Sequence, residues 1–266
     1  RIIIAGDSGV IGSYIKHHLN SLNTYDILGL NSKNIDLADL LNIKNTFKNE
    51  NPYDTLIFFI GLAHKKGTKK DFNAFEKTNF ETLKNLLSTL KKLNKMPKKI
   101  IFSSTISVYG ERYNTSHYDE TCTTNPSSPY AITKLKAENY LNTHFKDISW
   151  VLRFSPVYSS TFSLNIDRRT RIKRTFYKTG SGSAQLSLCN IKNIGVAIEG
   201  ILNNIVPNNT YNISDNQKYT YKKLLSYQKA SRVITIPRII FQVAYMCGLI
   251  FNNQFLKENS IKLLTN

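Results

Sequence analysis

Two side chains that could move protons lie four residues apart in the sequence, the phenol of Tyr130 and the amine of Lys134. Residues at i and i+4 share one face of a helix, so both can reach one site if this stretch is helical. A nearby ammonium favours the phenolate, which lowers the tyrosine pKa from about 10 toward the pH range of general acid-base catalysis. The same spacing also fits a tyrosine packed on a lysine stem at a helix surface, so the neighbouring segments must decide.

A strand-like apolar run at 100–102 precedes three hydroxyl residues, Ser103, Ser104 and Thr105. In an open α/β sheet, ligands bind beyond the carboxyl ends of the strands. These hydroxyl groups are therefore expected at the edge of the sheet where a ligand binds. This context favours the catalytic interpretation of Tyr130.

The glycines Gly6, Gly9 and Gly12 follow an apolar run at 2–5 and open directly into a helical pattern that begins with Val10 and Ile11. The first glycine permits a sharp turn, the second lets the backbone approach a pyrophosphate, and the third lets the helix pack closely on the strand. Unpaired amides at the positive end of the helix then meet the phosphates. Strand, turn and helix together predict that a dinucleotide binds here.

The end of the second predicted strand bears on which dinucleotide is bound. An acidic residue there normally accepts a bond from the adenosine ribose, but this chain has Asn31, Ser32 and Lys33. A neutral and basic rim does not repel a 2′-phosphate, so NADP(H) fits as well as NAD(H), with a slight preference for NADP(H). Asp36 and Leu37 either reach the adenine or belong to the N-cap region of the next helix.

Short apolar runs alternate with longer helical patterns, which is typical of an α/β fold with a Rossmann-type doubly wound parallel sheet. Strands are predicted at 2–5, 25–30, 55–60, 100–102 and 148–154, and helices at 10–22, 39–50, 71–94 and 129–144. After residue 158 the pattern becomes irregular. We therefore expect a dinucleotide-binding domain over 1–160 and a smaller substrate-binding region over 161–266, with 190–213 returning to the first domain.

The 266 residues include 36 Lys and Arg against 18 Asp and Glu, and the net charge of +18 raises the question of nucleic-acid binding. The basic residues are spread along a chain that is rich in Lys, Asn and Ile throughout, and they do not gather on one helix with interleaved aromatic residues, so a biased genome composition explains the charge equally well. An anionic, phosphate-bearing substrate is the intermediate alternative. The densest basic cluster contains Arg168, Arg169, Arg171 and Arg174, which we assign to the substrate.

Three widely spaced cysteines, Cys122, Cys189 and Cys247, argue against a disulfide framework or a metal site and favour a reducing cytoplasm. The most apolar helical stretch, 239–251, is shorter than the roughly 20 residues that span a bilayer. We therefore expect a cytoplasmic protein without a signal peptide, a transmembrane segment or a bound metal.

The order of these motifs, GxxGxxG, a strand ending in Thr105 and the Tyr130 and Lys134 pair, resembles the extended short-chain dehydrogenase/reductases of the NAD-dependent epimerase/dehydratase group. The resemblance implies an NAD(P) cofactor, with Tyr130 exchanging a proton with a sugar hydroxyl or ketone while a hydride moves to or from nicotinamide C4. Lys134 would bond the nicotinamide ribose and lower the tyrosine pKa, and Thr105 would bond the reacting oxygen. The resemblance also places the cofactor beside Gly61, Ala63, Ser103 and Phe154, and the substrate beside Ser107.

The resemblance also separates the reactions of this group. Its dehydratases carry an Asp-Glu pair directly after the catalytic Thr, where this chain has Ile106 and Ser107, so dehydration is disfavoured. Its epimerases often carry an Asn shortly after the Arg of the late strand, where this chain has Ser155 and Pro156, a pattern closer to the 4-keto reductases. The expected reaction is therefore epimerisation or reduction at C4 of a nucleotide-linked sugar, in surface polysaccharide synthesis.

The substrate end of the chain departs from the group. Leu186 stands where these enzymes commonly place an arginine that meets the nucleotide diphosphate, so either the 168–174 cluster binds the diphosphate or the substrate is not a nucleotide sugar. The competing function is a non-catalytic NAD(P)-binding sensor or RNA-binding protein; the leading hypothesis involves no nucleic acid. The resemblance suggests a homodimer through the helices at 71–94 and 129–146, and a monomer stays open.

Overall fold

The computed structural model describes residues 1–62, 69–110, 117–253, 256–257, 260–261 and 264. The chain divides into two compact units. The first comprises Arg1–Val108, Thr124–Phe154 and Ile191–Ile213, and the second comprises Tyr109–Thr123, Ser155–Asn190 and Ser214–Asn266. The segments 109–123 and 155–160, which the sequence analysis assigns to the dinucleotide-binding domain, thus group with the second unit.

The first unit is built on a six-stranded sheet with the order β11-β5-β4-β3-β1-β2, in which neighbouring strands run parallel. The Rossmann-type sheet predicted from the sequence is confirmed. Its strands are β1 (Ile2–Ala5), β2 (Ile27–Leu30), β3 (Thr55–Phe58), β4 (Lys99–Thr105), β5 (Ser149–Phe154) and β11 (Thr210–Ile213).

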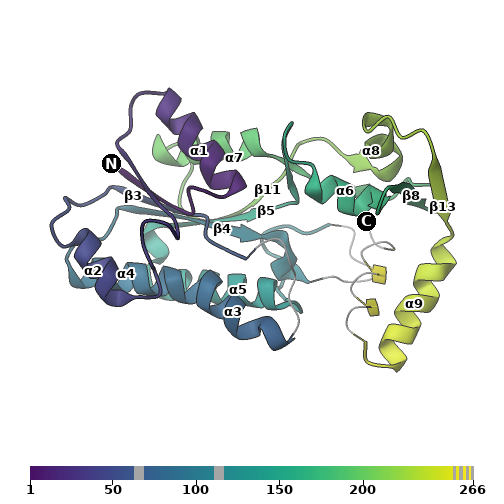
Figure 1. The fold of residues 1–266 in the computed structure, drawn as a ribbon, viewed down its shortest axis with the longest axis horizontal. Helices are drawn as coiled ribbons and strands as arrows, with labels where there is room; N and C mark the ends of the chain where they lie inside the picture. The colour runs from purple at the N-terminus through teal and green to yellow at the C-terminus, as the bar shows by residue number, and fades with distance from the viewer. Residues whose placement is uncertain (63–68, 111–116, 254–255, 258–259, 262–263, 265–266) are drawn as a thin grey trace. The chain divides into compact units, whose positions relative to one another are not determined.

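Helices cover both faces of this sheet, which explains why its central strands are continuous apolar runs. Figure 1 shows α1 (Val10–Ser21) and α7 (Ile191–Leu202) on one face. The other face carries α2 (Leu40–Phe47), α3 (Phe72–Glu76), α4 (Thr82–Lys92) and α5 (Pro129–His144) (Figure 1). Large buried side chains, including Phe47, Phe58 and Phe102, fill the space between the sheet and this second group of helices.

The strand order reverses at β1, because β2 lies on one side of it and β3 on the other. In open α/β sheets, this reversal opens a crevice beyond the carboxyl ends of the strands, where ligands bind. The glycine turn follows β1, Gly61 follows β3, and Thr105 ends β4. The topology therefore brings three of the predicted motifs to the same edge of the sheet.

The helix that carries Tyr130 begins where the sequence predicts. Ser128 is its N-cap, and the Ser128 hydroxyl accepts a hydrogen bond from the amide of Ala131. Pro129 occupies the first helical position, where its missing amide hydrogen is not needed and its fixed φ suits the helix. These two residues fix the start of α5, and with it the position of Tyr130 one residue into the helix.

The second unit consists of short elements. It contains α6 (Leu164–Thr170), α8 (Tyr221–Tyr227) and α9 (Arg238–Ile250), and a three-stranded sheet of order β13-β8-β7 formed by Val233–Ile236, Thr175–Thr179 and Arg171–Ile172. Two strand pairs complete it: β6 (Val157–Tyr158) with β10 (Cys189–Asn190), and β9 (Gln185–Leu186) with β12 (Tyr219–Thr220). Within the described ranges, no helix has both the length and the apolar character needed to cross a membrane.

Candidate active site

Thr105 and Tyr130 come together although 25 residues separate them in the sequence. Thr105 is the last residue of β4 and is buried, and hydrogen bonding to its side chain lowers the pKa of the half-buried phenol of Tyr130. The Thr105 Oγ1 atom also accepts a hydrogen bond from the amide of Ser107 at 3.2 Å. The predicted catalytic threonine and tyrosine therefore lie next to each other, with Ser107 beside Thr105.

Lys134 lies one turn after Tyr130 on α5 and is 2% exposed. Its Nζ atom donates hydrogen bonds to the main-chain oxygens of Ser103 at 2.9 Å and Ile60 at 3.1 Å. The same atom lies 4.8 Å from the centre of the Phe102 ring, which provides a favourable cation-π contact. The ammonium thus lies at the carboxyl ends of β3 and β4.

The expected lowering of the Tyr130 pKa by Lys134 is not found in the protein alone. Burial raises the pKa of Tyr130 to about 12, although the hydrogen bond with Thr105 lowers it in part. Burial also lowers the pKa of Lys134 to about 7, against the opposing effect of Glu138. Because the amine is bonded to carbonyl oxygens and carries only a fraction of its charge near neutral pH, it does little to favour the phenolate.

A buried ion pair supports this part of α5. Glu138, one turn after Lys134, is 1% exposed and accepts hydrogen bonds from Nη2 of Arg153 at 2.7 Å and from its Nε at 3.2 Å. Ser104 donates a further hydrogen bond to Glu138. The sequence reasoning missed Glu138, although an acidic residue four positions after Lys134 on the same helix face was the available signal.

The glycine turn has the shape that a pyrophosphate requires. Gly6 has φ +88°, which favours glycine, and a Cβ at Gly12 would lie 2.1 Å from the main-chain oxygen of Gly6. Within the described part of the chain, no side chain caps the N-terminus of α1, where Gly9 is the N-cap residue and Val10 and Ile11 begin the helix. The close packing and the uncapped amides fit the phosphates of a dinucleotide.

Asn79 has a structural role, because it fixes the loop after β3. It is fully buried in η2 (Lys77–Glu81), a π-helical segment between α3 and α4 that interrupts the predicted helix at 71–94. Its Oδ1 accepts from the amide of Leu62 at 2.8 Å, and its Nδ2 donates to Thr133 at 3.0 Å. Gly61 is held so close that a Cβ there would lie 3.1 Å from the Nζ atom of Lys134.

The remaining predicted cofactor residues occupy different environments. Phe154 is buried at the end of β5, paired in register with Thr105. Asn31, Ser32 and Lys33 follow β2 at the carboxyl edge of the sheet, and the last two are exposed. Asp36 is exposed and does not cap α2, because Asp39 does, and the Leu37 side chain is buried in the core. Ala63 lies outside the described residues.

The basic cluster assigned to the substrate belongs to the second unit. Arg168 and Arg169 lie on α6, Arg171 begins β7, and Arg174 directly precedes β8. Arg169 donates to the main-chain oxygen of Asn165 at 2.8 Å, while Arg171 lies 3.4 Å from Asp167 and packs over the ring of Phe176. Arg168, Arg171 and Arg174 are exposed.

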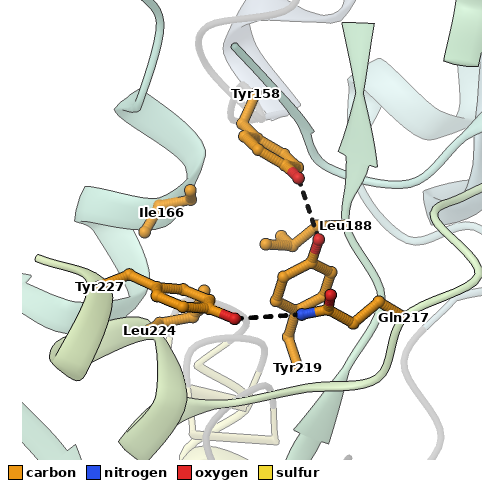
Figure 2. A pocket seen from close by; sticks show the side chains of 7 residues that line it. All are labelled: Tyr158, Ile166, Leu188, Gln217, Tyr219, Leu224 and Tyr227. Carbon is orange, nitrogen blue, oxygen red and sulfur yellow. Dashed lines mark hydrogen bonds between the residues drawn. The ribbon is translucent and has the colours of Figure 1, made fainter. Parts of the chain in front are cut away.

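A pocket of about 260 Å³ in the second unit was not predicted from the sequence. Figure 2 shows the residues that line it: Tyr158, Ile166, Leu188, Gln217, Tyr219, Leu224 and Tyr227. The hydroxyls of Tyr158 and Tyr219 both donate to the Oδ2 atom of Asp215, at 2.9 and 2.7 Å. Gln217 donates to the hydroxyl of Tyr227 at 3.4 Å. The pocket thus combines aromatic rings with hydroxyl and amide groups.

Comparison with known proteins gives a consistent result. The model of the family described as the NAD dependent epimerase/dehydratase family matches residues 2–214. A protein of Methanocaldococcus jannaschii, a candidate UDP-glucose 4-epimerase, is 31% identical over 172 residues, which is 59% of this chain and 56% of that protein. A second relative, the uncharacterized UDP-glucose epimerase YtcB of Bacillus subtilis, is 27% identical over 183 residues, which is 59% of this chain and 57% of that protein. The chain spans about half the length of each of these relatives.

Two solved structures illustrate the shared fold. UDP-glucose 4-epimerase of Thermotoga maritima, solved with UDP-glucose, aligns with a TM-score of 0.70 and 22% identity over 89% of this chain and 85% of the epimerase. The dTDP-4-dehydrorhamnose reductase of Bacillus anthracis, solved with NADP, aligns with a TM-score of 0.70 and 20% identity over 89% of this chain and 83% of the reductase. At these identities the two alignments show the fold.

Proposed function

The chain belongs to the NAD dependent epimerase/dehydratase family, and on that basis we propose that it is an NAD(P)-dependent enzyme acting at C4 of a nucleotide-linked sugar, as a 4-keto reductase or a 4-epimerase. The pair of Thr105 and Tyr130 at the carboxyl end of β4 carries this proposal. It stands at the sheet edge that also bears the glycine turn, as a proton donor beside a bound nicotinamide requires.

The chemistry divides between cofactor and protein. A bound nicotinamide supplies or accepts the hydride. Tyr130 gives a proton to the substrate oxygen or takes one from it, and the Thr105 hydroxyl beside the phenol bonds the same oxygen. Gly6, Gly9 and Gly12 leave room for the pyrophosphate at the start of α1.

In the protein alone, Tyr130 is in the protonation state that reduction of a ketone requires. With a pKa of about 12, the Tyr130 phenol is protonated at neutral pH and is ready to give its proton to a ketone oxygen as the carbonyl is reduced. Epimerisation begins in the opposite direction, with removal of a proton from a hydroxyl, and requires the phenolate. The residues Ser155 and Pro156 after β5 point to the same choice.

The second unit, taken by itself, carries groups of the kinds that bind sugars, nucleobases and phosphates. The pocket lined by Tyr158, Tyr219 and Tyr227 combines aromatic faces with hydroxyl groups, which suits a sugar ring or a nucleobase. The exposed Arg168, Arg171 and Arg174 suit a diphosphate. We place the reaction in surface polysaccharide synthesis in the cytoplasm, carried out by a homodimer.

The direct test is an assay of the purified protein with a nucleotide-linked 4-keto sugar and either NADH or NADPH. We expect oxidation of the reduced cofactor, and we expect Tyr130→Phe to abolish turnover while leaving cofactor binding nearly intact. Tyr140→Phe is the matched control, because Tyr140 lies on the same helix and packs against the rings of Phe80 and Phe145. Full activity in Tyr130→Phe would contradict the mechanism.

The molecules that copurify with the protein distinguish the two reactions. An epimerase keeps its cofactor between turnovers, so mass spectrometry would find tightly held NAD, and the protein would interconvert 4-epimers without added cofactor. A reductase releases its oxidised cofactor and consumes reduced cofactor in proportion to product. Dehydration, which we do not expect, would give a 4-keto-6-deoxy product from a nucleotide hexose.

The net charge of +18 favours one further candidate, an RNA-binding protein that retains the dinucleotide fold. Binding that depends on phosphate contacts weakens steeply as salt rises. The absence of RNA binding at about 50 mM salt would exclude this candidate, because electrostatic binding is strong under that condition.

A further inference from the structure

The carboxylate that the end of β2 lacks is supplied by another segment of the chain. Asp7, the residue after the first glycine of the turn, is 7% exposed. Its Oδ1 atom accepts a hydrogen bond at 2.8 Å from the side-chain amide of Asn31, the residue directly after β2. A carboxylate from the β1 turn therefore lies at the end of β2, where dinucleotide folds normally carry their ribose-binding acid.

The second strand is adapted to this arrangement. A Cβ at Gly29 would lie 2.0 Å from the Oδ2 atom of Asp7, so only glycine leaves room for the carboxylate above β2. The Nζ atom of Lys16, on α1, forms an ion pair with the same oxygen at 2.7 Å. Three separate segments, the glycine turn, α1 and β2, thus contribute to the placement of one buried acid.

Asp7 is ionised at neutral pH. Burial by itself raises the pKa of Asp7, but the hydrogen bonds from Lys16 and Asn31 outweigh that effect and hold the pKa below its usual value. Lys16, a cation at this position that could receive a 2′-phosphate, is already engaged by Asp7. Asn31, Ser32 and Lys33 by themselves indicate a neutral and basic surface at the end of β2. Asp7 adds a negative charge to this surface.

We propose that Asp7 takes the place of the missing β2 acid, recognises the hydroxyls of the adenosine ribose and disfavours a 2′-phosphate, so that the protein selects NAD(H) over NADP(H). This replaces the slight preference for NADP(H) that the residues after β2 indicate. The inference rests on the proposed function only in requiring that a nicotinamide dinucleotide binds at the glycine turn; it does not depend on the sugar or on the reaction.

The test is the ratio of two dissociation constants, for NADPH and for NADH, measured by nicotinamide fluorescence without substrate. For the wild type we expect the ratio to exceed one by roughly tenfold or more, because placing like charges together is costly. Asp7→Asn removes the charge but keeps the shape, and it should bring the ratio close to one. A purely structural role for Asp7 would weaken both cofactors alike and leave the ratio unchanged, which would overturn the proposal.

Asp26→Asn is the matched control, because Asp26 is an exposed carboxylate directly before β2, at the opposite end of this strand from Asn31. We expect it to leave the ratio at the wild-type value. A change of the ratio in Asp26→Asn with none in Asp7→Asn would overturn the proposal. A wild-type ratio at or below one would also overturn it.

Gly29→Ala provides a second route to the same result if Asp7→Asn does not fold. The added methyl group displaces the carboxylate, so the ratio should fall as it does in Asp7→Asn. In an Asp7→Ala background the same change should have little further effect, because the carboxylate is gone and the remaining close contact, with Lys16 Nζ at 2.7 Å, involves the end of a flexible side chain. An unchanged ratio in Gly29→Ala would count against the proposal. If the wild type binds neither cofactor, the proposed function is refuted. If it binds both, but the ratio of dissociation constants is the same in the wild type and in the Asp7→Asn and Gly29→Ala variants, only this inference is refuted.

Discussion

The Nζ atom of Lys134 donates to the main-chain oxygen of Ser103 at 2.9 Å, so the ammonium faces the end of β4. The amine is therefore buried among strand ends, with almost no exposure to solvent. Burial lowers the pKa of this amine, and the lowered pKa leads to the first of four predictions.

Lys134→Met should change the pH dependence of stability. The pKa of Lys134 is about 7 in the folded protein and near 10.4 in the unfolded chain, so between these values the unfolded state binds the extra proton. The wild type therefore loses stability as the pH falls from 10 to 7, by about 1.4 kcal/mol for each pKa unit of difference, and Lys134→Met does not. Urea unfolding at several pH values measures the difference between the two proteins.

Lys136→Met is the control for this effect. Lys136 lies on the same helix but its side chain is 47% exposed, and it pairs with Glu76 at the surface. The difference in unfolding free energy between wild type and Lys136→Met should stay nearly constant over the same pH range. A constant difference for Lys134→Met would show that the amine is not buried as described.

Glu138→Gln should destabilise the protein by about 3–5 kcal/mol, because it leaves the buried guanidinium of Arg153 without its carboxylate. Adding Arg153→Met should recover much of this loss, since the pair is then removed as a whole. Glu76→Gln breaks an exposed pair and should cost at most about 1 kcal/mol. Equal losses in Glu138→Gln and Glu76→Gln, measured by urea unfolding, would contradict the assignment.

Gly12→Ala and Gly9→Ala should have different effects. A Cβ at Gly12 would meet the main-chain oxygen of Gly6 at 2.1 Å, whereas a Cβ at Gly9 would lie 3.4 Å from the same oxygen. We expect Gly12→Ala to lower stability by about 1–3 kcal/mol through backbone displacement. Gly9→Ala should keep stability within about 0.5 kcal/mol and weaken dinucleotide binding. Thermal unfolding and cofactor titration separate the two results, and similar profiles would contradict the prediction.

Thr105→Val should reduce turnover by roughly 100-fold without weakening the cofactor. The hydroxyl forms the hydrogen bond that lowers the pKa of Tyr130, so its removal raises that pKa further and frees the phenol to rotate. Thr105→Ser restores the hydroxyl and should recover most of the activity. Steady-state kinetics with the reduced cofactor tests both variants, and wild-type turnover in Thr105→Val would remove Thr105 from the mechanism.

Much of the fold could be predicted because its signals are local. The apolar runs that become β1, β3 and β4 are continuous in the sequence, and Ser128 and Pro129 mark the start of α5. The spacing of Tyr130 and Lys134 guarantees a shared helix face. The π-helical segment at Lys77–Glu81 was not predictable from periodicity, because it follows from the buried contacts of Asn79 with Leu62 and Thr133.

The sequence by itself determined which motifs exist and in what order, since strand, turn and helix patterns depend on neighbouring residues. The tertiary structure alone decided what charge those motifs carry. It directed the amine of Lys134 toward Ser103, paired Glu138 with Arg153, and placed Asp7 against Asn31. The physical reason is that desolvation and ion pairing act through space, so the protonation and the partner of a buried side chain depend on segments far away along the chain.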